Sequence, residues 1–445
     1  MTASLPTLDV AIIGGGVAGL ATAHYLLARS PGTRLAVIEG SGRVGGNVRT
    51  LRHDDCLVDV GPDTLVTQDG ASSACDDLGV VAESPSSAAA RVHVAHDGRI
   101  DPMPEGLVFG VPRSFAAIAR TRLLSLPAKL RAACDLVLPN REGDGSLSVV
   151  ESRLGREAKE NLVEPLVSGI YGGELERLDA GVVMPQLAGT RGSLIRALAR
   201  APRRIPKMVG PARGMETLVE ALACSVSAER IFRARRVVAI ERGRSGERLR
   251  FGDGSALDAT QVVLATPPHA ALPLLRPHVP ELEGTLKARM RSAIVVVLAY
   301  DASTTKLPDG SGILVARKEA HAFVGVTFVH AKWPTRVREG RAVIRAVIDL
   351  DRRPDLAQAS DDEIVRAVHA DLSRHARVDV PLWAHVEHYP EATPIPELGH
   401  RARMNEARAQ ARNAGFSLVG AAYDGAGLAG CLRGARELAE ALAGG

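Results

Sequence analysis

Aromatic side chains are scarce in this chain, since phenylalanine, tryptophan and tyrosine together make up 3% of its 445 residues. A flat aromatic ligand would therefore have to be held mainly by aliphatic walls and a few polar anchors. Long apolar runs are missing as well, and none approaches the roughly 18 residues that a membrane-spanning helix needs. The N-terminus shows no basic segment followed by an apolar run and a cleavage site, so we expect no signal peptide.

Paired cysteines and metal-binding patterns are also missing. The five cysteines are scattered, with no CxxC pair and no His/Cys cluster, which indicates reduced thiols and argues against a disulfide framework or a zinc site. The histidines form no HExxH motif, so we expect no metal. The formal net charge of +4 is too small to imply nucleic acid as a partner. What remains is a globular protein of ordinary composition, long enough for two or three domains.

A glycine turn between two apolar runs opens the chain. Within residues 8–39, an apolar run leads into a GxGxxG turn formed by Gly14, Gly16 and Gly19. A helical run and a second apolar run follow, and the latter ends on Glu39. This order predicts a dinucleotide site, in which Gly16 lets the backbone approach a pyrophosphate and Glu39 accepts hydrogen bonds from a ribose. The predicted cofactor contacts of this unit are Gly14, Gly16, Val17, Ala18, Gly19 and Glu39.

The residues after Glu39 continue as an Arg-x-Gly-Gly segment, residues 43–46. Gly45 and Gly46 offer bare backbone to an extended cofactor, and Arg43 can reach a phosphate. The segment resembles the second signature of flavoproteins of the amine oxidase, phytoene desaturase and protoporphyrinogen oxidase superfamily, and this implies FAD. We find no second GxGxxG unit for NAD(P)H, so the electrons are expected to pass to oxygen or another acceptor. Further predicted cofactor contacts are Gly40, Arg43, Gly45, Gly46, Gly61, Pro62, Val237, Val238, Ala265 and Thr266.

A second strand, glycine turn and helix lies at the C-terminal end, in residues 419–431. Its helix N-terminus would point at an anionic or electron-rich group, either the pyrophosphate or the edge of the flavin ring. An ordinary capping helix is the alternative. The cofactor contacts predicted here are Tyr423, Gly425, Gly427 and Leu428.

Three segments narrow the resemblance to the protoporphyrinogen oxidases and their coproporphyrinogen-oxidising relatives. Residues 164–174 read EPLVSGIYGGE, which is similar to the EPxxxGIYxGD element of that family. Residues 213–218 read RGMETL and resemble its GGMxxL. The C-terminal segment, residues 420–434, matches GxxYxGxGxxxCxxxG. Together these segments cover the chain nearly end to end.

The resemblance implies an FAD enzyme that oxidises protoporphyrinogen IX or coproporphyrinogen III to the porphyrin with O2. Loss of a hydride from a methylene bridge gives a cation that a pyrrole nitrogen stabilises, so the protein mainly supplies orientation and a dry slot. Arg91 aligns with a family arginine that clamps a substrate propionate, and a solvated surface arginine is the alternative. The aliphatic walls of the slot would fall at Ile313, Leu314, Val324 and Phe328, where core strands are an equally good interpretation.

Several positions that shape the slot depart from the family pattern. Gly61-Pro62-Asp63 replaces GPN, Arg91-Val92 replaces Arg-Tyr, and the Gly-Gly strand expected near residues 341–350 is absent. The FAD frame is therefore a firmer expectation than the substrate. A related flavin amine oxidase or desaturase that acts on a secondary metabolite stays open, as does a non-catalytic flavin-binding scaffold.

The order of strand-like and helical runs predicts an α/β fold in three parts. A discontinuous Rossmann-like FAD-binding domain would comprise residues 1–75, 206–270 and 400–445. A mixed-sheet substrate-binding domain would comprise residues 76–103 and 271–399, and a helical domain residues 104–205. In the helical domain, the basic, leucine-rich piece from Arg113 to Leu138 either lies on an anionic membrane surface or packs as ordinary helix. We expect a cytoplasmic protein, with peripheral membrane attachment and a homodimer left open.

Overall fold

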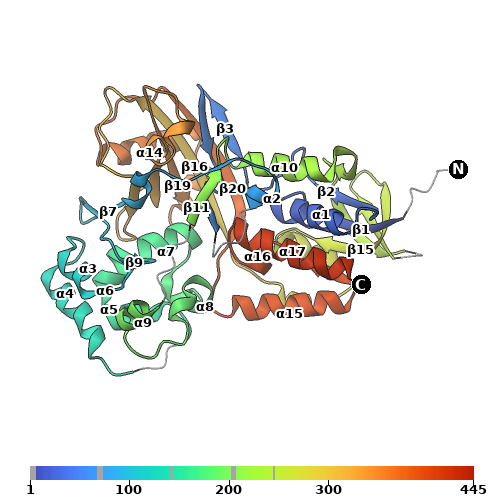
Figure 1. The fold of residues 1–445 in the computed structure, drawn as a ribbon, viewed down its shortest axis with the longest axis horizontal. Coiled ribbons are helices and arrows are strands. Elements are labelled where there is room, and N and C mark those ends of the chain that lie inside the picture. Colours follow the sequence, from blue (N-terminus) through green and yellow to red (C-terminus); the bar gives the residue numbers. More distant parts are fainter. Residues whose placement is uncertain (1–6, 68–73, 141–143, 202–206, 244–245, 445) are drawn as a thin grey trace.

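The computed structural model describes residues 7–67, 74–140, 144–201, 207–243 and 246–444. A seven-stranded sheet forms the part of the molecule on the right of Figure 1, where both chain ends lie. The strand order is β12-β2-β1-β15-β14-β13, and β21 pairs with β15. The strands are β1 (Leu8–Ile13), β2 (Leu35–Ile38), β12 (Ile231–Phe232), β13 (Val237–Arg242), β14 (Glu247–Phe251), β15 (Ala256–Leu264) and β21 (Phe416–Leu418).

Helices cover both faces of this sheet, which explains why its strands read as continuous apolar runs. Along β1, Val10 and Ile12 point to one face, and Ala11 and Ile13 point to the other. The first face packs against α1 (Val17–Arg29), α10 (Glu216–Val226) and α17 (Leu428–Ala443). The second face packs against α11 (Pro268–Leu275), α12 (Leu282–Thr285) and α15 (His400–Asn413).

A second seven-stranded sheet has the order β20-β16-β19-β18-β17-β7-β8. Its neighbouring strands are antiparallel except for β17 and β7, which run parallel, so the predicted mixed sheet is confirmed. Helix α14 (Asp361–Ser373) covers one face and begins with a capping box between Ser360 and Glu363. The strands are β7 (His93–His96), β8 (Arg99–Pro102), β16 (Met290–Asp301), β17 (Gly312–Val315), β18 (Gly325–Phe328), β19 (Arg341–Asp349) and β20 (Trp383–Pro394).

Short strands connect the two sheets. The hairpin of β3 (Thr50–His53) and β4 (Cys56–Asp59) packs on the face of the second sheet that is opposite α14. A three-stranded sheet then joins β5 (Leu65–Thr67), β11 (Lys207–Pro211) and β6 (Ala82–Glu83). The remaining short elements are β9 (Leu107–Val108), β10 (Val111–Pro112), α2 (Ala74–Asp77), α13 (Val329–Lys332) and α16 (Ala421–Asp424).

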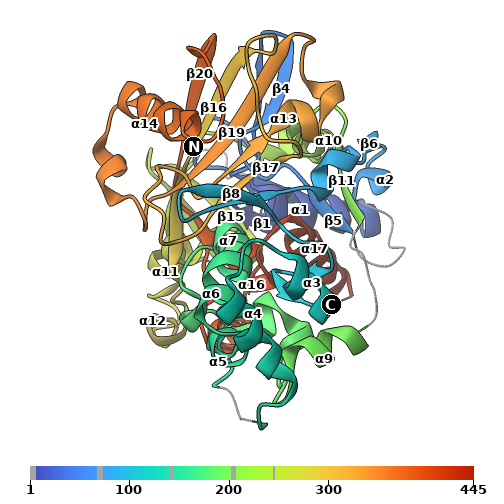
Figure 2. The same ribbon diagram turned by 90° about the vertical axis from the view of Figure 1, so that its left-hand side faces the viewer.

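Residues 104–201 are largely helical, as the sequence predicts, and they form a separate layer that faces the viewer in the lower half of Figure 2. The buried Asp135 organises this layer, because its carboxylate pairs with Arg153 at 2.8 Å and accepts from the backbone N–H groups of Leu194 and Ile195. In the described ranges, no helix is both long and apolar enough to cross a bilayer. The helices are α3 (Phe115–Arg120), α4 (Leu126–Ala133), α5 (Ser148–Leu154), α6 (Arg156–Ala158), α7 (Glu164–Tyr171), α8 (Ala180–Val183) and α9 (Leu194–Arg200).

The first sheet draws its strands from residues 8–38, 231–264 and 416–418, which lie far apart in the sequence. The three-part division proposed above, with its boundaries near 75, 103, 205, 270 and 399, stays a prediction. The hairpin of β7 and β8 is found where Asp97-Gly98 predicts it, and both turn residues have positive φ, as a tight hairpin turn requires.

Candidate functional site

The N-terminal glycine turn connects β1 to α1, and its glycines serve different purposes. Gly14 has φ +112°, and a Cβ there would lie 2.7 Å from the carbonyl oxygen of Ala265. A Cβ on Gly19 would lie 2.0 Å from the carbonyl oxygen of Gly14. These two glycines are therefore required by packing. Gly16 has ordinary φ, and a Cβ there would have no atom within 4 Å, so it borders open space at the N-terminus of α1.

Glu39 follows β2 and lies over this turn. One carboxylate oxygen accepts a hydrogen bond from the Gly15 N–H at 2.8 Å, and the other accepts from the Ser41 N–H at 2.7 Å. Each oxygen keeps a lone pair free, so the fixed carboxylate can still accept from ribose hydroxyls. The geometry agrees with the role that the sequence predicts for Glu39.

The segment with Gly45 and Gly46 lies directly against the turn. The Gly45 N–H donates to the carbonyl oxygen of Gly15 at 2.8 Å, and a Cβ on Gly46 would lie 3.5 Å from Gly16 Cα. Arg43 does not point to a free phosphate position, because its guanidinium donates to the carbonyl oxygens of Gly46 and Val48 at 2.6 and 3.2 Å. In this structure Arg43 holds its own loop together, and a phosphate contact would have to compete with these bonds.

A second glycine turn, between β21 and α17, lies beside the first. Gly425 and Gly427 have φ +106° and +101°, and a Cβ on either would have no atom within 4 Å. A Cβ on Gly420, at the N-terminus of α16, would be 3.8 Å from Ala18 Cβ, and Leu428 of α17 packs on the core cluster that holds Ala18, so this turn lies near the start of α1. Leu428 is the first residue of α17. Two helix N-termini and their free N–H groups therefore border the same open region, which favours an anionic ligand such as a pyrophosphate.

Tyr423 is buried beside this second turn, and burial raises the pKa of its hydroxyl. The hydroxyl donates to the carbonyl oxygen of Thr266 at 3.1 Å. The hydroxyl oxygen of Thr266 is itself buried and has no hydrogen-bond partner in the described part of the chain. A buried hydroxyl without a partner at the end of β15 fits a polar cofactor atom at this position.

Strand β13, at the edge of the first sheet, carries the two valines predicted to contact the cofactor, and they differ in burial. Val237 is a core residue, packed with Ile38 against the first sheet. Val238 is 53% exposed. A Cβ on Gly40 would approach Arg236, so the end of β2 and the start of β13 lie side by side. Of the two valines, only Val238 has a side chain free to contact a ligand.

Gly61 and Pro62 lie between the loop after Gly46 and the second sheet. A Cβ on Gly61 would lie 2.0 Å from the carbonyl oxygen of Asn47, and the Asn47 side chain donates to Ala392 of β20 at 2.8 Å. The sequence did not identify two cations here. The Arg345 guanidinium donates to the Gly61 carbonyl oxygen at 2.6 Å, and Lys332 pairs with Asp63 at 2.6 Å. Pairing of β19 with β16 and β18 is needed to place Arg345, so only tertiary structure reveals it.

The residues predicted to form the substrate slot do not share one surface. Ile313 and Phe328 are at most 1% exposed and pack in the core beneath α14. They are therefore core residues of their strands and do not line a slot. Val324 is buried as well. Leu314 points to the opposite face, where a Cβ on Gly169 of α7 would contact it at 3.8 Å.

Arg91 is exposed and already has a partner. Its guanidinium forms an ion pair with Asp309 at 3.0 Å, and the two side chains are 56% and 79% exposed. The predicted propionate clamp would require this surface pair to open. The role of Arg91 therefore stays a prediction.

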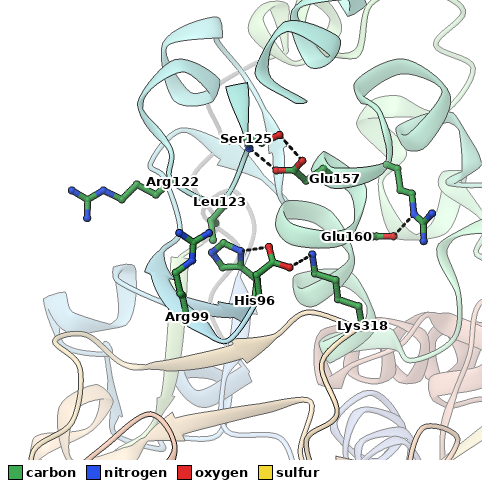
Figure 3. A pocket seen from close by; sticks show the side chains of 10 residues that line it. His96, Arg99, Arg122, Leu123, Ser125, Glu157, Glu160 and Lys318 are labelled. Carbon is green, nitrogen blue, oxygen red and sulfur yellow. Dashed lines mark hydrogen bonds and ion pairs between the residues drawn. The ribbon is translucent and has the colours of Figure 1, made fainter. Parts of the chain in front are cut away.

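Two adjoining cavities lie outside the region of the glycine turns, between the hairpin of β7 and β8 and the helical layer. Figure 3 shows the residues that line the first of them. Their volumes are about 500 and 800 Å³, and they share Arg99, Arg122 and Ser125. Within the described ranges, Arg99, Arg120 and Arg122 form no ion pair or side-chain hydrogen bond. The cavities are therefore basic grooves on the surface.

The fold and the two glycine turns define a flavoprotein oxidoreductase. The chain matches the family described as "Flavin containing amine oxidoreductase" over residues 17–443, and it belongs to this family. The dinucleotide turn, the open glycines and the unpartnered Thr266 hydroxyl fit a flavin cofactor.

Particular relatives match the chain over nearly its whole length. It is 28% identical to coproporphyrinogen III oxidase of Bacillus subtilis (strain 168), with 97% of each chain covered. It is 25% identical to chloroplastic protoporphyrinogen oxidase of Nicotiana tabacum, with 98% of this chain and 86% of the relative covered. A solved structure from Exiguobacterium sp. 255-15, provisionally named protoporphyrinogen oxidase, has a TM-score of 0.86 at 26% identity and covers 99% of both chains. The predicted resemblance is confirmed.

Proposed function

We propose that this protein uses FAD to oxidise a porphyrinogen to the porphyrin, with O2 as the final electron acceptor, in tetrapyrrole biosynthesis. The observation that carries the proposal is the glycine turn that Glu39 covers, with a second glycine turn near the start of the same helix, in a chain whose full-length relatives are named for porphyrinogen oxidation. Two helix N-termini and a ribose-binding carboxylate are the requirements of a dinucleotide, which supports FAD over a mononucleotide flavin.

Bound FAD would supply the acceptor for the hydride that leaves a methylene bridge. The chain itself would hold the substrate against the face of the second sheet that is opposite α14. Leu314 on β17 and Val347 on β19 give this face apolar character, and Gly169 of α7 lies across from Leu314. Such a surface orients a tetrapyrrole and excludes water, which is what this oxidation needs from the protein.

The substrate is tested by aerobic fluorescence with purified, FAD-loaded protein and both porphyrinogens, corrected for spontaneous oxidation. Rapid appearance of porphyrin fluorescence with protoporphyrinogen IX or coproporphyrinogen III would support the proposal and name the substrate. Folded, yellow protein that accelerates neither oxidation would contradict it. The related amine oxidase or desaturase activity would then be tested with a panel of amines.

Arg91→Ala is expected to change the kinetics only slightly. Because Arg91 and Asp309 are both exposed, a clamp at this position gains little over its interaction with water and Asp309, on the order of 1 kcal/mol or less. We expect KM to rise by no more than about fivefold, with kcat unchanged. The control Asp309→Asn frees Arg91 and should not raise KM. A hundredfold rise in KM for Arg91→Ala would show that Arg91 turns inward when substrate binds.

We further propose that the helical layer attaches peripherally to anionic membranes. Leu126 and Leu130 on α4 are 76% and 71% exposed, and the unpaired Arg120 and Arg122 lie in the same region, beside the basic grooves. Apolar side chains next to free cations are typical of surfaces that bind anionic lipid.

Sedimentation with vesicles tests this attachment. The wild type should sediment with phosphatidylglycerol vesicles more than with phosphatidylcholine vesicles, and the double variant Leu126→Asn/Leu130→Asn should bind at least about fivefold more weakly. Val380→Asn, which changes an equally exposed residue elsewhere, is the matched control. Equal sedimentation of all three proteins would contradict attachment through α4.

A further inference from the structure

One side of strand β19 carries an arginine where the neighbouring positions are apolar. Ile344, Ala346 and Ile348 point into the core beneath α14, and Val343 packs with β4 on the opposite face. The alternation of side chains along a strand therefore places Arg345 on the same face as Val343, toward the cofactor segments. A long cation in the middle of a seven-stranded sheet is costly unless it meets a polar group.

A series of contacts leads from the dinucleotide turn to Arg345. Gly46 lies against Gly16, at a Cβ-to-Cα distance of 3.5 Å, and Asn47 is the next residue along the chain. Gly61 packs on the Asn47 carbonyl oxygen, and Arg345 donates to the Gly61 carbonyl oxygen at 2.6 Å. A dinucleotide whose phosphates lie at Gly16 and which extends along this loop would bring its ring end toward Arg345.

The charges at this end of the loop do not balance. Lys332 pairs with Asp63 at 2.6 Å and also donates to Thr64 at 3.0 Å. Burial alone would raise the pKa of the Asp63 carboxyl, but the charges of Lys332 and Arg345 outweigh burial and hold this pKa well below its usual range. Asp63 therefore stays ionised and compensates one of the two cations, which leaves one positive charge in excess.

Two buried polar atoms on this face of the second sheet lack a partner. The Nε atom of Arg345 and the hydroxyl of Tyr389 are buried and have no hydrogen-bond partner among the described residues. Burial raises the pKa of Tyr389 to about 12, so its hydroxyl remains a donor. Tyr389 lies on β20, two residues after Glu387, and the carboxylate of Glu387 is already paired with Arg49 at 2.7 Å. A ligand with hydrogen-bond acceptors would pair with these donors.

We propose that the uncompensated positive charge of Arg345 faces the ring end of the bound flavin. This charge makes the flavin easier to reduce. The inference rests on the proposed function, because it requires that FAD binds along this loop. A positive charge near the ring lowers the free energy of the reduced, anionic flavin more than that of the neutral, oxidised one. Within the protein this effect is larger than at an exposed site, since little water screens the charge.

The test is the midpoint reduction potential of the bound FAD, measured without porphyrinogen. Arg345→Gln should shift the reduction equilibrium at least about tenfold against the reduced form, which for a two-electron couple is about 30 mV lower. Arg345→Lys keeps the charge and should stay near the wild type. The matched control is Arg341→Gln on the same strand. Arg341 pairs with Asp54 of the hairpin of β3 and β4, so its charge is already compensated.

A second variant guards against a folding defect in Arg345→Gln. Lys332→Met leaves Asp63 to neutralise Arg345, so it should lower the potential by a similar amount while Arg345 stays in place. Unchanged potentials in both Arg345→Gln and Lys332→Met, or an equal fall in Arg341→Gln, would overturn the inference. A wild type that takes up no FAD would overturn the proposed function, and this inference with it. If the wild type holds FAD and both Arg345→Gln and Lys332→Met leave the reduction potential unchanged, this inference alone is overturned.

Discussion

Replacing Gly16 with leucine is expected to abolish flavin binding and leave the fold almost unchanged. A Cβ on Gly16 would meet no protein atom within 4 Å, and its φ of −71° is accessible to any residue. The side chain would instead occupy the open region where the predicted pyrophosphate approaches the N-terminus of α1. The loss of a glycine at the N-cap of α1 costs at most about 1 kcal/mol of stability.

The measurement is the flavin content of purified Gly16→Leu, together with its thermal midpoint as the apoprotein. We expect no visible flavin absorbance and a midpoint close to that of the wild-type apoprotein. Gly32→Leu is the control, because Gly32 also borders open space but lies at the far end of α1. In Gly19→Ala the new Cβ would collide with the Gly14 carbonyl oxygen, so this variant should lose stability. Retention of flavin by Gly16→Leu would show that the cofactor does not approach this turn.

Replacing Arg336 with methionine is expected to lower the free energy of unfolding by about 3–5 kcal/mol, the usual cost of leaving a buried charge without its partner. The side chains of Arg336 and Asp59 are each 1% exposed and pair at 2.8 Å. Arg336 also pairs with Glu83 at 2.7 Å and donates to the Pro211 carbonyl oxygen at 2.8 Å. Its guanidinium therefore joins β4, β6 and β11 between the two sheets.

Chemical denaturation of the apoprotein checks this prediction. Arg338→Met is the matched control, since Arg338 is 48% exposed and solvent screens its ion pair with Asp54, so that its loss should leave the stability almost unchanged. The double variant Arg336→Met/Asp59→Asn removes both charges and should recover part of the loss. Equal denaturation midpoints for Arg336→Met and Arg338→Met would contradict a structural role for the buried pair.

The cofactor frame could be predicted because its signals are local. Strand, turn, helix and strand follow one another between residues 8 and 39, and β2 forms the predicted second apolar run just before Glu39. The C-terminal turn at Gly425 and Gly427 is local in the same way. In such units the glycine spacing and the flanking apolar runs lie in one contiguous segment, so the unit can be recognised without knowing any distant partner.

The slot residues could not be predicted, because their roles depend on which face of a sheet they occupy. Ile313 and Leu314 are neighbours in the sequence, yet the first lies in the core and the second on the opposite face. A strand buried on both faces has no polar alternation, so its sequence does not reveal which side chains face a ligand. Arg345 was missed for a related reason, because its neighbours come from residues 61–63 and 332.

Helix α15 was also missed, although a weak signal exists. Its sequence, HRARMNEARAQARN, is dominated by arginine and polar residues. Only His400, Met404, Ala407 and Ala411 are buried, at intervals of three and four residues that mark one face of a helix. Two of these four residues are small alanines, which is why this face does not stand out in the sequence.

The central claim, that this chain transfers electrons from a porphyrinogen to bound FAD, is tested most directly under anaerobic conditions. Purified, FAD-loaded protein is mixed with each porphyrinogen, and the visible absorbance of oxidised flavin and the porphyrin fluorescence are followed before and after O2 is admitted. Each FAD accepts two electrons, whereas a porphyrinogen must lose six to become the porphyrin. We therefore predict that the flavin is bleached without O2, and that its colour returns and porphyrin accumulates once O2 is admitted. Flavin that stays oxidised with both porphyrinogens, in folded protein, would contradict the claim.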